Sequence, residues 1–138
     1  MIRNHEWMHE QLDIDFCVST FDTDPFEPQP EGVGTIFPYW VQDGSSQRRF
    51  LELPYTLVQD FTLFVLLGEK SLDIWTQKLD WIASKGGMAL LNSHSDYMNF
   101  GSDPSGLEEY PSSFFCNFLK YVQRRHKEHY WHALPSQV

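Results

Sequence analysis

The pattern of apolar and polar positions predicts two helices. Between Ser71 and Lys85 the apolar residues recur at helical spacing, with Ser71 as a candidate N-cap and Gly86-Gly87 as the stop. A second helix is predicted from Pro111 to roughly Lys127. The residues expected to face the core are Leu72, Trp75, Leu79 and Ile82 in the first helix and Phe115, Phe118, Leu119 and Val122 in the second.

Shorter apolar runs predict strands. Ile14, Phe16 and Val18 alternate with other residues, and the runs 36–41 and 50–53 flank a turn at Asp43-Gly44. The run 88–91 follows the first helix and its glycine stop, which is the order typical of an α/β unit with a buried strand. The run 61–67 fits either a buried strand or a short helix, and Asn4 to Gln11 fits a short helix. Residues 95–110 read as a polar loop.

Composition and charge narrow the class of protein. The 138 residues fit a single domain over 1–138. A net charge of −9 would repel phosphate backbones, so nucleic acid is not an expected partner. The longest apolar run, 61–67, is too short to cross a bilayer, and the N-terminus has no signal-peptide pattern, so we expect a cytoplasmic protein. Cys17 and Cys116 are expected to be two thiols, although one disulfide is an open alternative.

Candidate chemistry gathers where predicted strands end. Asp22 and Asp24 follow the first strand, and His94 follows the run 88–91. A histidine beside a carboxylate can act as a general acid, because the carboxylate fixes the ring tautomer and favours the imidazolium. The alternative for His94 is a structural histidine that bonds the backbone, and for the aspartates it is a capping or turn role.

Several stretches together resemble a known family. Leu90-Leu91-Asn92-Ser93-His94 and Ser19-Thr20-Phe21-Asp22-Thr23-Asp24-Pro25-Phe26 look like two motifs of the NodB-homology polysaccharide deacetylases. The stretches 52–67, 75–87 and 130–135 resemble a bacterial subgroup of that family. The chain is therefore similar, over nearly its whole length, to the C-terminal portion of such a protein.

The resemblance implies an α/β fold, a partial and distorted (β/α) barrel lacking the N-terminal strands. It implies hydrolysis of N-acetyl groups on carbohydrate, in which a divalent metal, with zinc expected, activates water. By this similarity His94 would protonate the leaving amine and Asp22 or Asp24 would orient it. Leu90 would line the acetyl pocket and Trp40 would contact the substrate.

The sequence departs from the family in its metal motifs. The family has an Asp-Asp pair and a His-x-x-x-His pair upstream of these elements, and no Asp-Asp pair occurs in this chain. The metal ligands are therefore expected to be absent from it. The alternative function is a noncatalytic binding module of the same fold that covers its open strand edges by pairing with itself or another chain, as a homo-oligomer would.

Two histidine patterns suggest metal sites but have simpler readings. His5-Glu6-Trp7-Met8-His9 matches the H-E-x-x-H pattern of zinc proteases, yet it runs directly into a strand, and we interpret it as a chance match on an amphipathic helix. His126, His129 and His132 recur every three residues and are interpreted as solvated residues at the end of the second helix.

Overall fold

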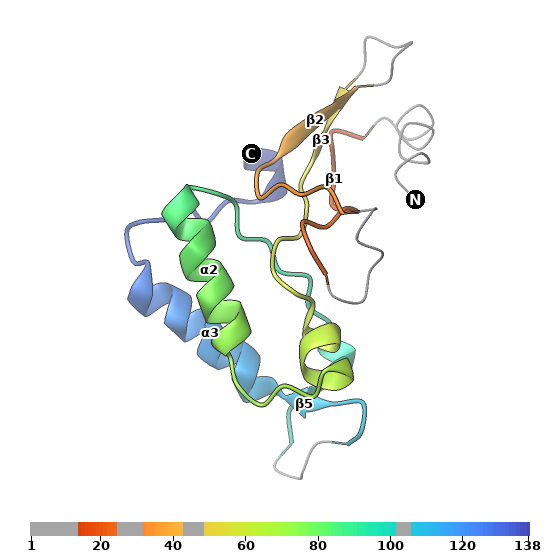
Figure 1. The fold of residues 1–138 in the computed structure, drawn as a ribbon, viewed down its shortest axis with the longest axis vertical. Helices are drawn as coiled ribbons and strands as arrows, with labels where there is room; N and C mark the ends of the chain where they lie inside the picture. The colour runs from red at the N-terminus through yellow and green to blue at the C-terminus, as the bar shows by residue number, and fades with distance from the viewer. Residues whose placement is uncertain (1–13, 25–31, 43–48, 102–105) are drawn as a thin grey trace.

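Three short strands form a sheet at one end of the molecule (Figure 1). The structure is a computed structural model that describes residues 14–24, 32–42, 49–101 and 106–138. The strands are β1 (Phe16–Cys17), β2 (Tyr39–Gln42) and β3 (Arg49–Glu52). In the order β1-β3-β2, β1 runs parallel to β3 and β2 runs antiparallel to it. Strands are thus confirmed in the three runs that predicted them, with bounds shifted by a few residues.

A buried glutamate holds the chain that leaves β1. Glu52, the last residue of β3, is 1% exposed, and its Oε1 accepts hydrogen bonds from Ser19 N, Thr20 N and Thr20 Oγ1, each at 2.9 Å. Burial raises the pKa of the neighbouring Cys17 thiol, and the negative charge of Glu52 adds to that rise. The glutamate therefore ties β1 to β3 just before the aspartates of the following segment.

The run 61–67 is helical rather than extended. It forms η3 (Phe61–Leu66), a wide turn in which Leu67 N donates to Thr62 O at 3.0 Å, five residues back. Asp60 is its N-cap residue, with Oδ1 accepting a hydrogen bond from Phe61 N at 2.8 Å. Thr62, Leu63 and Phe64 of this turn are buried, so η3 brings an acidic residue and an apolar face into the interior together.

The clearest predicted helix is confirmed as α2 (Asp73–Lys85), which buries Trp75, Leu79 and Ile82. The helix begins slightly later than the predicted cap, although Ser71 Oγ still accepts a hydrogen bond from Asp73 N at 3.3 Å. It ends at Gly86, whose φ of 67° lies in the left-handed region that glycine adopts at little cost.

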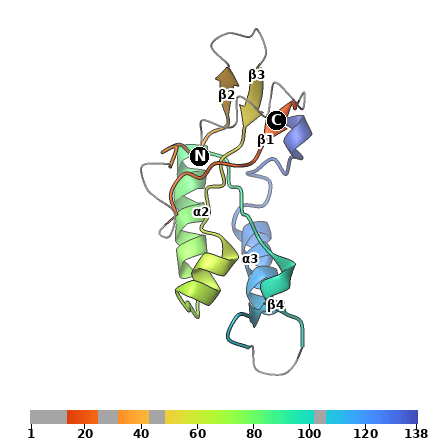
Figure 2. The same cartoon turned by 90° about the vertical axis from the view of Figure 1, so that its right-hand side faces the viewer.

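The second predicted helix is α3 (Ser112–Arg125), which lies beside α2 in both views (Figure 1, Figure 2). Its core-facing residues are Phe114, Phe118, Tyr121 and Val122. The expectation that Leu119 faces inward was wrong, because that residue is 46% exposed. Positions 114, 118, 121 and 122 follow helical spacing along one stripe, and Leu119 falls beside it.

Between α2 and α3 the chain forms a short helical turn and two short strands. After η4 (Ser95–Tyr97) it forms β4 (Met98–Asn99), which pairs in parallel with β5 (Tyr110–Pro111) through Met98 and Tyr110. The predicted polar loop at 95–110 therefore contains ordered elements. The buried strand predicted at Met88–Leu91 was wrong: the segment has no regular secondary structure, and none of its four residues is buried.

The side chain of Thr56 explains why residues 88–91 form no strand. Thr56 Oγ1 donates to Met88 O at 2.9 Å and accepts from Leu90 N at 3.0 Å, so a hydroxyl takes the place of backbone partners. The backbone bonds of the segment are irregular: Leu90 O accepts from Thr56 N at 2.9 Å and from Leu57 N at 3.2 Å, and Met88 N donates to Ile36 O at 2.8 Å. A β-strand needs a regular series of backbone hydrogen bonds to its neighbour, and the bonds to the Thr56 hydroxyl interrupt that series.

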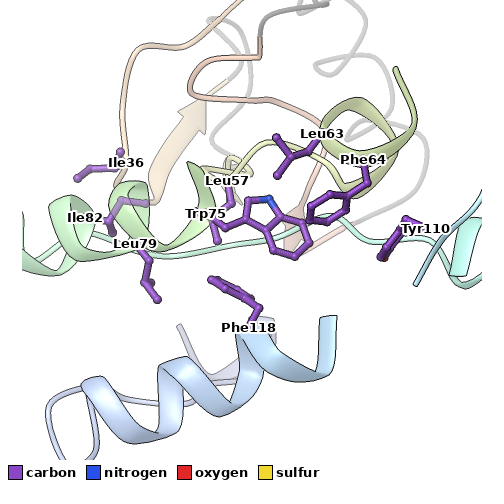
Figure 3. Packing of buried hydrophobic residues seen from close by; sticks show 9 residues of the cluster. All are labelled: Ile36, Leu57, Leu63, Phe64, Trp75, Leu79, Ile82, Tyr110 and Phe118. Carbon is purple, nitrogen blue, oxygen red and sulfur yellow. The ribbon is translucent and has the colours of Figure 1, made fainter. Parts of the chain in front are cut away.

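The core lies between η3, α2 and α3 (Figure 3). Trp75 is its centre, 0% exposed, with ring centroids at 4.8 Å from Phe64 and 4.9 Å from Phe118. Its indole Nε1 donates to Val58 O at 2.7 Å, so the one polar atom of the ring is satisfied. The buried residues of the cluster are Ile36, Leu57, Leu63, Phe64, Trp75, Leu79, Ile82, Tyr110 and Phe118.

A polar cluster at the surface joins α2 to the end of α3. Asp80 Oδ2 accepts a hydrogen bond from Tyr121 OH at 2.9 Å, and Asp80 Oδ1 lies 2.9 Å from His126 Nε2. Partial burial would raise the pKa of Asp80, but the hydrogen bonds from Tyr121 and His126 and the charge of Arg125 together lower it. The Asp80 side chain is 36% exposed, so this cluster is largely a surface contact.

The described residues therefore have a mixed α/β architecture with two small sheets. The strands within ranges 14–24, 32–42, 49–101 and 106–138 do not close into a barrel. Cys17 and Cys116 form no disulfide with each other. The predicted helix at 4–11, including the His5 to His9 motif, and the predicted turn at 43–44 lie outside the described residues.

Candidate functional site

A buried carboxylate lies at the centre of the candidate site. Asp60 is 0% exposed, and each of its oxygens accepts hydrogen bonds from more than one donor. Oδ1 faces Phe61 N at 2.8 Å and His94 Nδ1 at 2.7 Å, whereas Oδ2 accepts from His94 N at 2.7 Å and Tyr110 OH at 2.9 Å. Each oxygen of this buried group therefore has two hydrogen-bond partners, as a buried polar group requires.

The position of Asp60 follows from its place in the chain. It precedes the apolar turn η3, and its side chain accepts from the first backbone N–H of that turn, as short polar residues do at helix starts. Because the next residues of η3 pack into the core, the carboxylate is carried inward with them. The extended segment that ends at His94 then passes it closely enough for both His94 N and His94 Nδ1 to reach it.

His94 connects the buried carboxylate to the surface. Its side chain is 36% exposed, and its ring lies 5.5 Å from the ring of Tyr97 in an edge-on arrangement. An ionised carboxylate can only accept hydrogen bonds, so with Asp60 ionised the contact of 2.7 Å places a proton on His94 Nδ1. In the neutral ring Nε2 then carries the lone pair, and in the charged ring Nε2 carries a proton that it can give up.

Tyr110 closes the other side of the carboxylate. The residue is 2% exposed, and its ring centroid lies 4.8 Å from that of Phe64. Burial raises the pKa of Tyr110, and the hydrogen bond to Asp60 and the negative charge of Asp60 raise it further. The phenol therefore remains protonated and acts as a hydrogen-bond donor to Asp60.

The arrangement can perform general acid–base chemistry. A buried aspartate bonded to one ring nitrogen of a half-exposed histidine orients the ring and leaves its other nitrogen available, which a histidine that moves protons requires. The aspartate itself is inaccessible, so the exposed side of His94 is the part of the pair that a reactant can approach.

The structure corrects the expected partner of His94, which is Asp60 and neither Asp22 nor Asp24. Asp22 is 7% exposed, and its Oδ2 lies 2.7 Å from Lys78 Nζ, so it forms an ion pair with α2. Asp24 is buried at 1% exposure. The expectation was wrong because strand ends alone do not determine which segment passes a given side chain.

The two predicted substrate contacts lie in different surroundings. Leu90 is partly buried in the segment that leads to His94, and its backbone bonds Thr56 and Leu57. Trp40 is 56% exposed in β2, with the guanidinium of Arg49 4.3 Å from its ring centroid. Since β2 and β5 lie at opposite ends of the molecule (Figure 1), Trp40 is not brought to the Asp60–His94 pair.

The residues that the structure describes do not form a site for a divalent metal. Within the described part of the chain, no three histidine, cysteine, aspartate or glutamate side chains come together as a metal site would require. Of the three spaced histidines, His126 follows the last residue of α3 and contacts Asp80, so the helix does not continue through His129 and His132. We therefore derive no step through a metal ion.

Sequence pattern gave only a weak signal for the missed residues. Asp60 is a single acid within an apolar stretch, and such a residue must be buried with donors around it or turned outward. That signal indicates a buried carboxylate but not its partner. Tyr110 precedes a proline after a polar loop and has no pattern that distinguishes it from an ordinary core aromatic residue.

Comparison with known proteins gives no match: no protein-family model, no curated protein and no solved structure resembles the chain to a significant degree. None of the helices formed by the described residues is long and apolar enough to span a membrane. A function can therefore be inferred from the geometry of the Asp60–His94 pair and from the resemblance of the sequence motifs.

Proposed function

We propose that Asp60 and His94 form the general acid of a hydrolase acting on carbon–nitrogen bonds, of the deacetylase type that the sequence resemblance implies. The observation that carries this proposal is the 2.7 Å contact between His94 Nδ1 and a carboxylate that is 0% exposed. In the proposed role a water molecule adds to the acetyl carbonyl of an N-acetylated carbohydrate, and the imidazolium gives its Nε2 proton to the amine nitrogen as the carbon–nitrogen bond breaks. Acetic acid and the free amine leave, and a proton from the added water restores the imidazolium.

The division of labour between the two residues follows from their exposure. An amine is a poor leaving group unless its nitrogen is protonated, so amide cleavage needs an acid that reactants can reach. His94 meets that need, since its side chain is 36% exposed. Asp60 supplies the countercharge from the interior, where the interaction is little screened by solvent.

An assay of amine release tests this proposal. The chain is incubated with N-acetylated chito-oligosaccharides, with and without added divalent cations, and free amine is measured. We expect His94→Gln and Asp60→Asn to lower the rate by about 10²- to 10⁴-fold, the usual contribution of a positioned acid. The matched control His126→Gln removes the other histidine that contacts an aspartate and should leave the rate unchanged.

Two results would contradict the proposal. Amine release that is equal in the wild-type chain and in His94→Gln would exclude His94 as the acid. Absence of amine release from the wild-type chain under every cation condition would exclude hydrolysis by this chain alone.

A second candidate function, a noncatalytic module that pairs with another copy, is favoured by one surface. The register places Phe16, Leu51 and Trp40 side by side across β1, β3 and β2 on one face of the sheet. Phe16 is 39% exposed and Trp40 is 56% exposed, so two large aromatic side chains on one face of the sheet lie open to solvent. Sedimentation as a monomer at high concentration, unchanged by Trp40→Ser, would rule out self-association through this face.

We also propose a cytoplasmic location. The supporting observation is that the sequence holds two cysteines and no C-x-x-C pair, a cysteine usage that fits a reducing compartment. Cell fractionation tests this proposal, and recovery of the chain outside the cytoplasm would contradict it.

A further inference from the structure

The carboxylate of Asp60 has two oxygens with different surroundings. Oδ1 is bonded by Phe61 N and by His94 Nδ1, so it is the oxygen that acts on the histidine ring. Oδ2 is bonded by His94 N and by Tyr110 OH. The carboxylate can rotate about its Cβ–Cγ bond unless both oxygens are held, so the donors on Oδ2 decide whether Oδ1 keeps facing His94.

Tyr110 is the only one of these donors that comes from a third segment of the chain. Phe61 adjoins Asp60 itself, and both remaining bonds come from His94. The hydrogen bond from Tyr110 therefore ties the carboxylate to a part of the core that belongs to neither Asp60 nor His94. The Tyr110 ring is held in place there, because it is 2% exposed and packs on Phe64.

Tyr110 is placed by the pairing of two short strands. The chain forms η4 and β4 after His94, and β4 pairs with β5 through Met98 and Tyr110, which places the phenol beside Asp60. The Tyr97 ring, by contrast, contacts His94 at 5.5 Å and Phe61 at 4.5 Å, so it touches the histidine ring directly rather than the carboxylate.

We infer that Tyr110 is a positioning residue: its hydroxyl holds Asp60 Oδ2 so that Oδ1 stays bonded to His94 Nδ1 and Nε2 faces outward. This inference rests on the proposed role of Asp60 and His94. A carboxylate can only accept, so the phenol must donate, and burial beside a negative charge keeps the phenol protonated.

The test is the hydrogen exchange of the His94 Nδ1 proton in the isotope-labelled full chain, followed by NMR through saturation transfer from water. Tyr110→Phe keeps the ring in the core and removes only the hydroxyl. We expect this exchange to become about tenfold faster, because losing one hydrogen bond to a charged group loosens the carboxylate by that order. The Trp75 Nε1 proton, bonded to Val58 O in the same core, reports general loosening and should be unchanged.

A matched control is available in the second aspartate–tyrosine–histidine cluster. Tyr121→Phe removes a hydroxyl that donates to Asp80 at the same distance of 2.9 Å as Tyr110 donates to Asp60. It should leave the exchange of the His94 Nδ1 proton unaltered. If it changes that exchange as much as Tyr110→Phe does, the effect is not specific to the site and the inference fails.

The remaining outcomes are also decisive. Unchanged His94 exchange in Tyr110→Phe would overturn the inference, and so would equal acceleration at His94 and Trp75, which would reduce Tyr110 to a packing residue. If the wild-type chain has no proton on His94 Nδ1, the proposed function itself is wrong. If the wild-type chain has this proton and its exchange is the same in Tyr110→Phe, only the positioning role is wrong.

Discussion

The replacement Asp60→Asn tests the energetic importance of the buried carboxylate. The change preserves size but replaces one accepting oxygen by an amide group that donates. At least one pair of donors, either Phe61 N and His94 Nδ1 or His94 N and Tyr110 OH, would then face another donor. Because Asp60 is 0% exposed, water cannot replace the lost acceptor.

The expected loss is large. Breaking a buried, hydrogen-bonded charged group typically costs about 3–5 kcal/mol of the free energy of unfolding. A domain of this size usually has about 5–15 kcal/mol in total, so the variant should remain folded but with a clearly lower denaturation midpoint. Urea denaturation followed by tryptophan fluorescence measures the difference.

Asp80→Asn is the matched control. Asp80 also bonds a tyrosine hydroxyl and a histidine nitrogen, each at 2.9 Å, but its side chain is 36% exposed. Exposed pairs contribute about 0–1 kcal/mol, so this variant should unfold at nearly the wild-type midpoint. Equal losses for the two variants would refute the reasoning, because burial would then not determine the cost.

Other perturbations give further expectations. Trp75→Phe removes the indole bond to Val58 O and leaves a void, so the free energy of unfolding should fall by about 2–4 kcal/mol by urea denaturation, whereas Trp81→Phe at a position 46% exposed should change it little. Because the pKa of Asp80 is lowered from 3.8, its contribution is present above that pH and disappears as pH falls through the lower folded value. Wild type and Asp80→Asn should therefore converge in stability at acid pH, and a difference that persists there would contradict this sign. Gly86→Ala places a Cβ on a residue with φ 67° and should lower the free energy of unfolding by about 1 kcal/mol, measured as a lower thermal midpoint. An unchanged midpoint would exclude strain at this cap.

The helices were the most predictable part of the fold. The spacing of Trp75, Leu79 and Ile82 and the glycine at 86 determine α2 locally, because one face must be buried and the chain must turn at its end. The segment 88–91 was predicted as a strand and is not one, since the hydroxyl of Thr56 takes backbone donors and acceptors that a strand would use. No local pattern in 88–91 reveals a partner 32 residues away.

The sequence predicted the type of site, a histidine with a carboxylate partner, but not which residues would form it. A histidine with a carboxylate partner was expected at His94, and the structure provides one. The partner is Asp60, whose approach depends on how η3 packs and on the path of a segment that follows more than thirty residues later. Tyr110 depends on a further return of the chain through β4 and β5. Contacts of this sort follow from tertiary packing, which single-sequence patterns do not encode.

The most direct test of the account is the protonation of the neutral His94 ring in the wild-type chain, read from long-range ¹H–¹⁵N NMR correlations above the pH at which the ring titrates. We expect a proton on Nδ1, bonded to Asp60, and a lone pair on Nε2. A neutral ring protonated on Nε2, with no proton on Nδ1, would contradict an ionised Asp60 that orients His94 and with it the proposed acid.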